Sequence, residues 1–357
     1  MSKLWERKLN EATDEVELKE VELDQVKVKE PTVIFLSGFS TLDREKGYVA
    51  GAIKRIEEML GFNGKEEKPV NIFAWSHKGF RNLFNMVGYH LRPKKFASKA
   101  AKTIAGKIML PLVSKDITYD EKGQVTGGTP LPLDEAKANL KNVTLFGYSA
   151  GTVLAQETYN ATLNFMTKAG YDEKQAKELL HEVVLISAGN MSRPGKEKNR
   201  FTTLYLAATN DKLIRAKNRL TASLKEMFRH YSKKLRIKSL SKVSLHISAP
   251  VRGGMREMKK DKKGNWFRKK IDLLYPNWLL RRSYHELPHY VTHEDRHNKF
   301  SKIAIYALTN SVQRKERPKN TEDLLQPAEP FPGAVYPPSF QEDRNLYQLR
   351  IKAAMKP

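Results

Sequence analysis

The chain has 357 residues, of which 40% are hydrophobic and 29% charged, with a formal net charge of +24 and no cysteine. This composition is typical of a folded protein, and the lack of cysteine excludes disulfides, thiolate metal ligands and a cysteine nucleophile. No apolar run reaches the roughly 20 residues of a membrane-spanning helix, and the charged N-terminus lacks the apolar stretch of a secretory signal. We therefore expect a cytoplasmic protein, or one exported without a conventional signal peptide, as a secreted effector would be.

Apolar runs along the chain predict strands. Residues Val16–Val28 alternate between apolar and polar side chains, which predicts one or two half-buried strands at a sheet edge. Six later runs are apolar without alternation, a pattern typical of parallel strands covered on both faces. These runs are Thr32–Leu36, Val70–Trp75, Val143–Phe146, Val183–Ile186, Thr203–Ala207 and Val243–Ile247.

Helical patterns fall between these runs, at Tyr48–Leu60, Thr152–Met166, Lys212–Tyr231 and Phe300–Val312. Alternation of strands and helices indicates an α/β fold, so we expect a mostly parallel central sheet flanked by helices. Two connections, residues 78–141 and 249–287, are too long for simple loops and are expected to form a lid or cap. The sequence thus predicts one domain over residues 1–315 and a proline-rich tail over residues 316–357.

The first insertion contains an amphipathic cationic helix, predicted over Phe96–Val113. One interpretation is a lid or surface helix whose apolar side packs on the domain. The other is a lid whose apolar side touches a membrane.

The sequence Gly147-Tyr148-Ser149-Ala150-Gly151 lies between a buried strand and a helix. This Gly-x-Ser-x-Gly arrangement resembles the nucleophile elbow of the α/β hydrolases, in which a tight turn holds the serine above the sheet. The resemblance extends from about Val33 to Asn310 and implies an α/β-hydrolase fold with Ser149 as the nucleophile. The competing interpretation is a glycine turn with an incidental serine.

A serine hydroxyl needs a base, and an acid that orients the base. The family order Ser, Asp, His implies that the acid follows a later strand, where Asp211 follows the run that starts at Leu204. Asp211 could instead belong to an ordinary turn or cap a helix.

The base is expected just before the last helix, where four histidines recur at intervals of four: His285, His289, His293 and His297. A capping box that begins at Thr292 predicts a helix from His293 onwards, which leaves His289 in the preceding loop. The resemblance also favours His289, with the other three as alternatives.

The resemblance further implies an oxyanion hole. Residues Ser37 to Ser40 follow the first buried run, where the family has its oxyanion loop, so the backbone N–H groups of Phe39 and Ala150 are the expected donors. Ser37 stands where the family often has histidine.

Two other classes of function remain open. The strings His285-Glu-x-x-His289 and His293-Glu-x-x-His297 have the spacing of a zinc-dependent hydrolase, although Pro288 interrupts the first. Basic stretches at 212–242 and 258–270 suit either a solvated basic face around an insertion or a lipid- or nucleic-acid-binding protein on a hydrolase fold. No DNA or RNA motif accompanies them, so an anionic membrane surface is the favoured of these two partners.

We therefore expect a serine hydrolase that cleaves carboxylic ester or thioester bonds through an acyl-enzyme, without a cofactor or metal. The apolar helix and the positive charge favour a lipase-, phospholipase- or esterase-like enzyme acting on a small or lipid acyl ester. The acyl chain, the head group and the oligomeric state have no signature in the sequence.

Overall fold

A computed structural model describes most of the predicted sheet and its helices. The described residues are 3–10, 15–23, 26, 28–37, 45–62, 69–76, 88–89, 95–121, 123–192, 200–208, 236–241, 244–249, 299–314, 316, 318, 323–324 and 331.

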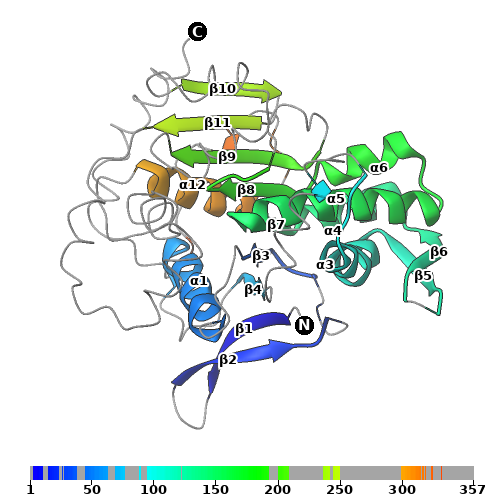
Figure 1. Ribbon diagram of the computed structural model, residues 1–357, viewed down its shortest axis with the longest axis horizontal. Coiled ribbons are helices and arrows are strands. Elements are labelled where there is room, and N and C mark those ends of the chain that lie inside the picture. The colour runs from blue at the N-terminus through cyan, green and yellow to red at the C-terminus, as the bar shows by residue number, and fades with distance from the viewer. Residues whose placement is uncertain are drawn as a thin grey trace.

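The protein has an α/β fold built on a mixed sheet (Figure 1). The strands hydrogen-bond in the order β10-β11-β9-β8-β7-β3-β4-β1-β2, and the seven from β9 to β2 form a sheet with a parallel core. Strand β11 continues the sheet parallel to β9, while β1, β2 and β10 pair antiparallel at the two edges. The bounds are β1 (Lys3–Asn10), β2 (Glu15–Val21), β3 (Thr32–Leu36), β4 (Asn71–Ser76), β7 (Val143–Tyr148), β8 (Val184–Ala188), β9 (Thr202–Ala208), β10 (Arg236–Ser241) and β11 (Ser244–Ala249).

The parallel strands confirm the prediction from apolar runs. Each of the six predicted runs overlaps one of β3, β4, β7, β8, β9 and β11, and every residue of β3, β7 and β8 is buried. The edge strand expected after Val16 is β2. Strand β1 was not predicted, because its sequence is mostly charged or polar even though Leu4 and Trp5 are buried.

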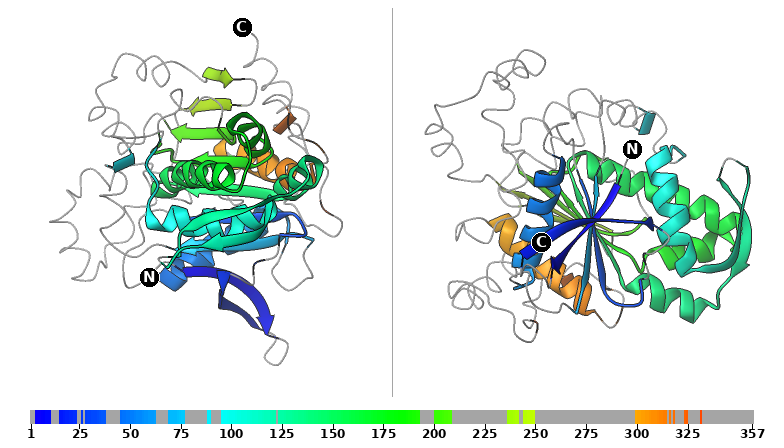
Figure 2. Two further views of the ribbon diagram at one scale, coloured as in Figure 1. Left: turned by 90° about the vertical axis from the view of Figure 1, so that its right-hand side faces the viewer. Right: turned by 90° about the horizontal axis from the view of Figure 1, so that it is seen from below.

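Helices cover both faces of the sheet (Figure 2). Helices α1 (Glu45–Met59) and α12 (Lys299–Gln313) cover the first face. Helices α3 (Lys99–Ile104), α4 (Leu133–Lys141), α5 (Ala150–Lys168) and α6 (Glu173–Leu180) lie on the second face. The first core, beneath α1 and α12, includes Val33, Phe35, Ile53, Phe146 and Leu308. The second core includes Ile34, Leu36, Ile104, Leu145 and Leu154.

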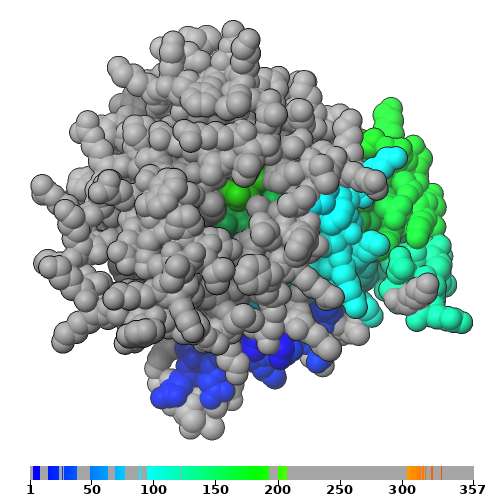
Figure 3. Space-filling model, in the orientation of Figure 1, coloured from blue at the N-terminus to red at the C-terminus, as the bar shows by residue number. Residues whose placement is uncertain are grey.

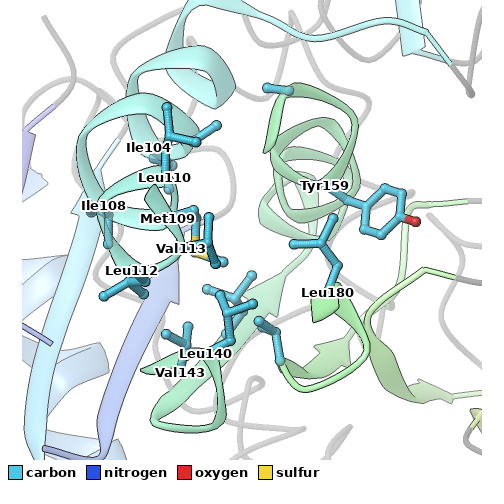
Figure 4. Close-up of a cluster of buried hydrophobic side chains, with 14 of the residues drawn as sticks. Ile104, Ile108, Met109, Leu110, Leu112, Val113, Leu140, Val143, Tyr159 and Leu180 are labelled. Carbon is cyan, nitrogen blue, oxygen red and sulfur yellow. The ribbon is translucent and has the colours of Figure 1, made fainter. Parts of the chain in front are cut away.

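The amphipathic helix of the first insertion lies on α5. Helix α3 begins after its N-cap Ser98 and continues through a π-helical turn, Ala105–Met109, and a 3-10 turn, Leu110–Leu112. Its apolar side chains are buried in the second core, and Figure 4 shows Ile104 and Met109 on the side of the segment that faces α5. The interpretation as a helix packed on the domain is therefore confirmed. The membrane-contact interpretation is wrong for these side chains, because the protein itself covers them.

A small antiparallel hairpin, β5 (Ser114–Tyr119) and β6 (Val125–Pro130), follows this helical segment and packs on α5. Sequence patterning did not predict it, because most of its side chains are exposed and polar.

Two residues of the predicted tail contribute to the first core. Leu324 and Phe331 are buried, and the ring of Phe331 lies 5.4 Å from that of Phe62. The side-chain amide of Asn310, in α12, donates to the Leu324 carbonyl at 2.9 Å. At these two positions the tail is therefore part of the packed domain.

Within the described parts of the chain, no helix is both long and apolar enough to cross a bilayer.

Candidate active site

The strand order alone indicates where a ligand would bind. Strand β3 lies between β4 and β7 in the sheet. The helix that follows β3 in the chain, α1, covers the first face, whereas the helix that follows β7, α5, covers the second face. The connections after β3 and β7 therefore diverge, and the carboxyl ends of two such strands are where open α/β sheets bind ligands. Atoms of the green part of the chain, which includes α5 and β8, are visible near the centre of the face that Figure 3 shows.

Ser149 lies at this position, directly after β7, in a strained backbone conformation. Its φ is 54° and its ψ is −120°, a combination that glycine adopts readily and other residues avoid. Among the described non-glycine residues, Asp116 alone shares a positive φ, and aspartate tolerates this region better than serine. Strain of this kind costs about 1–3 kcal/mol and persists where the surrounding structure enforces it, often at functional sites.

Ser149 does not act as a helix cap, although it stands in the N-cap position of α5. An N-cap serine normally accepts a hydrogen bond from an amide in the first turn, which would explain its presence structurally. Ser149 makes no such bond, whereas Ser98 accepts from Ala101 N at 3.3 Å and Asp172 accepts from two amides of α6. The ordinary structural role of a serine at a helix start is therefore not the role of Ser149.

The glycine after the elbow permits an unusually close approach of two elements. A Cβ added to Gly151 would lie 1.9 Å from the Leu36 carbonyl oxygen and 2.9 Å from that of Ser37. A Cβ at Gly147 would lie 3.1 Å from the Gly151 oxygen. The first turn of α5 thus lies directly against the carboxyl end of β3, and glycine is needed for this contact.

Backbone hydrogen bonds fix the elbow to its neighbours. Ser149 N donates to Ala188 O at 3.1 Å, which extends the pairing of β7 with β8 as far as the turn. The Ser149 carbonyl accepts from Thr152 N at 3.0 Å and from Thr152 Oγ1 at 2.6 Å. The Thr152 hydroxyl in turn accepts from Met191 N at 2.9 Å, which connects the turn to the loop after β8.

The loop after β8 is itself organised by one buried amide. Asn190 Oδ1 accepts from Ser187 Oγ at 3.1 Å, from Ser192 N at 2.9 Å and from Ser192 Oγ at 2.7 Å. Because these three residues are fully buried, this network holds the loop rigidly beside the elbow. No sequence motif marked Asn190.

One expected oxyanion donor lies at this site. Ala150 is the first residue of α5, so its N–H belongs to the amides at a helix start that have no partner within the helix. The helix dipole of this 19-residue helix adds positive potential at the same point. The position suits the stabilisation of a developing negative charge.

The remaining predicted site residues lie outside the described residues. These are Phe39, Asp211 and His289, with the alternative histidines His285, His293 and His297 and the His-Glu-x-x-His strings that contain them. Of the basic stretches, residues 258–270 and most of 212–242 lie outside them too. The described residues hold no cluster of three or more His, Asp or Glu side chains that could bind a metal ion.

A buried carboxyl group, Glu157, was not predicted from the sequence. It lies on α5, two turns after Ser149, and its Oε2 accepts from Ser98 N at 3.2 Å and from Ser98 Oγ. Burial raises the pKa of Glu157 to about 7, and the hydrogen bonds from Ser98 oppose that rise. Eight residues of helix place it about 12 Å along α5 from Ser149. It is therefore too far along the helix to orient a base at the elbow.

No known family matches the chain, and no curated protein sequence matches it.

Proposed function

We propose that the protein is a serine hydrolase with an α/β-hydrolase fold, in which Ser149 is the nucleophile that attacks carboxylic ester or thioester bonds. The observation that carries this proposal is the strained backbone of Ser149, in a turn between a buried parallel strand and a helix, at the carboxyl ends of diverging strands. A strained serine that caps nothing is best explained by a need to present its hydroxyl.

The proposed reaction follows acyl-transfer chemistry. The Ser149 oxygen attacks the acyl carbon while His289 takes the hydroxyl proton, and the carbonyl electron pair moves onto the carbonyl oxygen. The tetrahedral intermediate collapses, and the leaving alcohol or thiol receives the proton from His289. Water, deprotonated by the same imidazole, then attacks the acyl carbon, and the bond from this carbon to the Ser149 oxygen breaks. His289 returns the proton to the Ser149 oxygen, and the carboxylic acid is released. Asp211 orients the imidazole, and the N–H groups of Ala150 and Phe39 stabilise the oxyanion.

We favour an acyl ester carried on an anionic molecule or surface as the substrate. The net charge of +24 attracts anions, including the head groups of phospholipids. A lipase- or phospholipase-like activity fits this charge, whereas the apolar side of α3 is not available to bind lipid because it is buried.

Covalent labelling tests the nucleophile. A fluorophosphonate probe is expected to label the wild-type protein at Ser149, as identified by mass spectrometry of the tryptic peptide, and Ser149→Ala is expected to lose labelling and ester turnover. The matched control is Ser114→Ala, which removes another buried serine hydroxyl far from the elbow, at the start of β5. Circular dichroism and thermal unfolding establish that both variants are folded.

The substrate class is tested with p-nitrophenyl esters of increasing chain length, assayed beside anionic and zwitterionic phospholipid vesicles. Full turnover by a folded Ser149→Ala protein would refute the proposal. Turnover that disappears with EDTA and survives at Ser149→Ala would instead support the zinc-dependent alternative. Vesicle binding without labelling or turnover would support a lipid-binding protein.

A further inference from the structure

The Thr152 hydroxyl is a buried group at the elbow that the proposed mechanism does not use. Thr152 lies in the first turn of α5 and is 0% exposed. Its Oγ1 donates to Ser149 O at 2.6 Å and accepts from Met191 N at 2.9 Å. A backbone N–H can only donate and a carbonyl oxygen can only accept, so the direction of both hydrogen bonds is determined. The hydroxyl therefore connects the loop after β8 to the carbonyl of the proposed nucleophile.

A hydrogen bond from a helical threonine to a nearby backbone carbonyl is common in itself. Thr162, further along α5, donates in this way to Thr158 O at 2.8 Å. Thr152 is unusual in the carbonyl that it contacts, because that carbonyl belongs to the strained residue Ser149. The ψ of Ser149, −120°, is the rotation that sets the direction of this carbonyl. The bond from Thr152 therefore helps to hold the strained conformation of the elbow.

The Ser149 carbonyl and the Ala150 N–H belong to the same peptide group. A trans peptide is planar, so its carbonyl and its N–H point in opposite directions and cannot turn independently. The Ser149 carbonyl points into the first turn of α5, toward Thr152, and the Ala150 N–H therefore points away from the helix. A contact that fixes the carbonyl also fixes the direction of the expected oxyanion donor.

The hydrogen bonds polarise this peptide group as well. Met191 N–H, the Thr152 hydroxyl and the Ser149 carbonyl form a continuous chain of hydrogen bonds. Each bond in such a chain strengthens the next, so a carbonyl that accepts a strong bond makes the N–H of its own peptide a better donor. The chain ends at Ala150 N–H, where the oxyanion of the substrate would form.

We propose that Thr152 is a positioning residue of the oxyanion hole, whose hydroxyl fixes and polarises the Ser149–Ala150 peptide so that the Ala150 N–H points at the substrate oxygen. This inference rests on the proposed hydrolase function. The Thr152 hydroxyl does not contact the substrate, and its proton stays on its oxygen throughout the reaction. The Ala150 N–H interacts most strongly when the substrate oxygen is negatively charged, so loss of the Thr152 hydroxyl slows the chemical step and leaves substrate binding nearly unchanged.

The test is the variant Thr152→Val, which nearly keeps the shape of the side chain and removes the hydroxyl. Thr152 N also donates to Ser149 O, at 3.0 Å, so the peptide would be loosened and not released. We therefore expect kcat for a p-nitrophenyl ester to fall by about 10-fold, less than the roughly 100-fold effect of a lost oxyanion donor, with little change in KM. The inhibition constant of an alkyl boronic acid, which forms a tetrahedral anion on Ser149, should rise by a similar factor. Hydrolysis of the corresponding thionoester should fall less, because its sulfur is a weak hydrogen-bond acceptor.

Thr162→Val is the matched control. Thr162 is also buried in α5, and its replacement removes the same kind of bond, the one to Thr158 O. Thirteen residues of helix place it about 20 Å along α5 from Ser149, so kcat and boronate inhibition should not change. The conservative variant Thr152→Ser retains the hydroxyl and should keep kcat within about threefold of wild type. If Thr152→Val fails to fold, as judged by circular dichroism, Thr152→Ser and Thr152→Ala, which differ by the hydroxyl alone, make the same comparison.

The outcomes separate this inference from the proposed function. A folded Thr152→Val protein with kcat within about threefold of wild type, while Ser149→Ala is inactive, would overturn the role of Thr152 and leave the hydrolase intact. Equal losses in Thr152→Val and Thr162→Val would also overturn it, because the effect would then belong to the helix as a whole. Equal losses with the ester and the thionoester would overturn it too, since the hydroxyl would then act on the nucleophile and not on the oxyanion donor. Full activity of Ser149→Ala would remove both proposals.

Discussion

Replacement of Gly151 by alanine tests the contact between the elbow helix and β3. The new Cβ would lie 1.9 Å from the Leu36 carbonyl oxygen and 2.6 Å from the Leu36 carbonyl carbon, whereas ordinary contacts begin at 3.4 Å. The backbone of α5 or of β3 must therefore move by more than 1 Å. Both elements are held by hydrogen bonds within the sheet or the helix, so neither can yield as a flexible side chain would.

We expect Gly151→Ala to lower the free energy of unfolding by about 3 kcal/mol or more, at the upper end of the cost of overpacking. With an unfolding entropy of about 2.1 cal/mol/K per residue, this corresponds to a melting temperature about 4 °C lower. A displacement of about 1 Å at the elbow should also reduce ester turnover by about 100-fold.

Gly51→Ala is the matched control, because it makes the same substitution in a helix without a steric conflict. Gly51 lies in α1, and a Cβ there would have no atom within 4 Å. We expect this variant to be more stable than wild type by about 0.5–1 kcal/mol, the ordinary gain from alanine in a helix. Urea unfolding followed by circular dichroism measures both changes. Equal stability of Gly151→Ala and wild type would refute the close approach of α5 to β3.

Three further variants, Glu157→Gln, Asp172→Asn and Phe331→Ala, test groups away from the elbow. Burial raises the pKa of Glu157 to about 7, so the native state binds this proton more tightly than the unfolded chain, and stability falls as pH rises from about 4.5 through 7. Glu157→Gln should therefore exceed wild type in unfolding free energy at pH 8, by up to about 3 kcal/mol, and equal it at pH 4. Amides of α6 lower the pKa of Asp172, so Asp172→Asn should show the opposite pattern, with a loss at pH 7 that disappears at low pH. Phe331→Ala should cost about 3 kcal/mol in urea unfolding if the tail packs in the first core, whereas Leu133→Ala, at an exposed position, should change little.

The parallel strands could be predicted because their environment is uniform. Strands β3, β7 and β8 are covered on both faces, so every position favours an apolar residue and the run stands out from its neighbours. Helix α5 was equally clear, since its positions from 150 to 162 are all buried. The small helices α4 and α6 were missed because each buries one narrow side and exposes the rest.

Strand β1, which lies between the edge strand β2 and β4, could not be predicted from local patterns. Strand β1 is rich in charged residues and is held by pairing with its sequence neighbour β2 and with β4, a strand far away in the sequence. An ion pair of Arg7 in this strand with the buried carboxylate of Glu57 in α1 explains one of its charges. The sequence alone does not show this ion pair, because Arg7 and Glu57 come together when the chain folds.

At the site, sequence reasoning identified Ser149 and Ala150 from one pentapeptide, since glycine on both sides of a serine after a buried strand has a clear steric meaning. The same reasoning assigned Ser37 to a backbone loop and assigned no role to its side chain. The backbone of Ser37 contacts both β4 and the first turn of α5, and no local pattern of residues encodes that meeting.

Three local costs coincide at the carboxyl ends of β3 and β7. Ser149 holds a backbone conformation that glycine would adopt more easily, Ser37 buries a hydroxyl without a protein partner among the described residues, and Gly151 forgoes the helix propensity of alanine. A sequence selected for stability alone would have glycine at position 149 and alanine at position 37. It would also have alanine at position 151, with more space between α5 and β3. Natural sequences keep such costs where function requires them. Their coincidence at the point where the strand order diverges is therefore stronger support for an active site than the Gly-x-Ser-x-Gly motif alone.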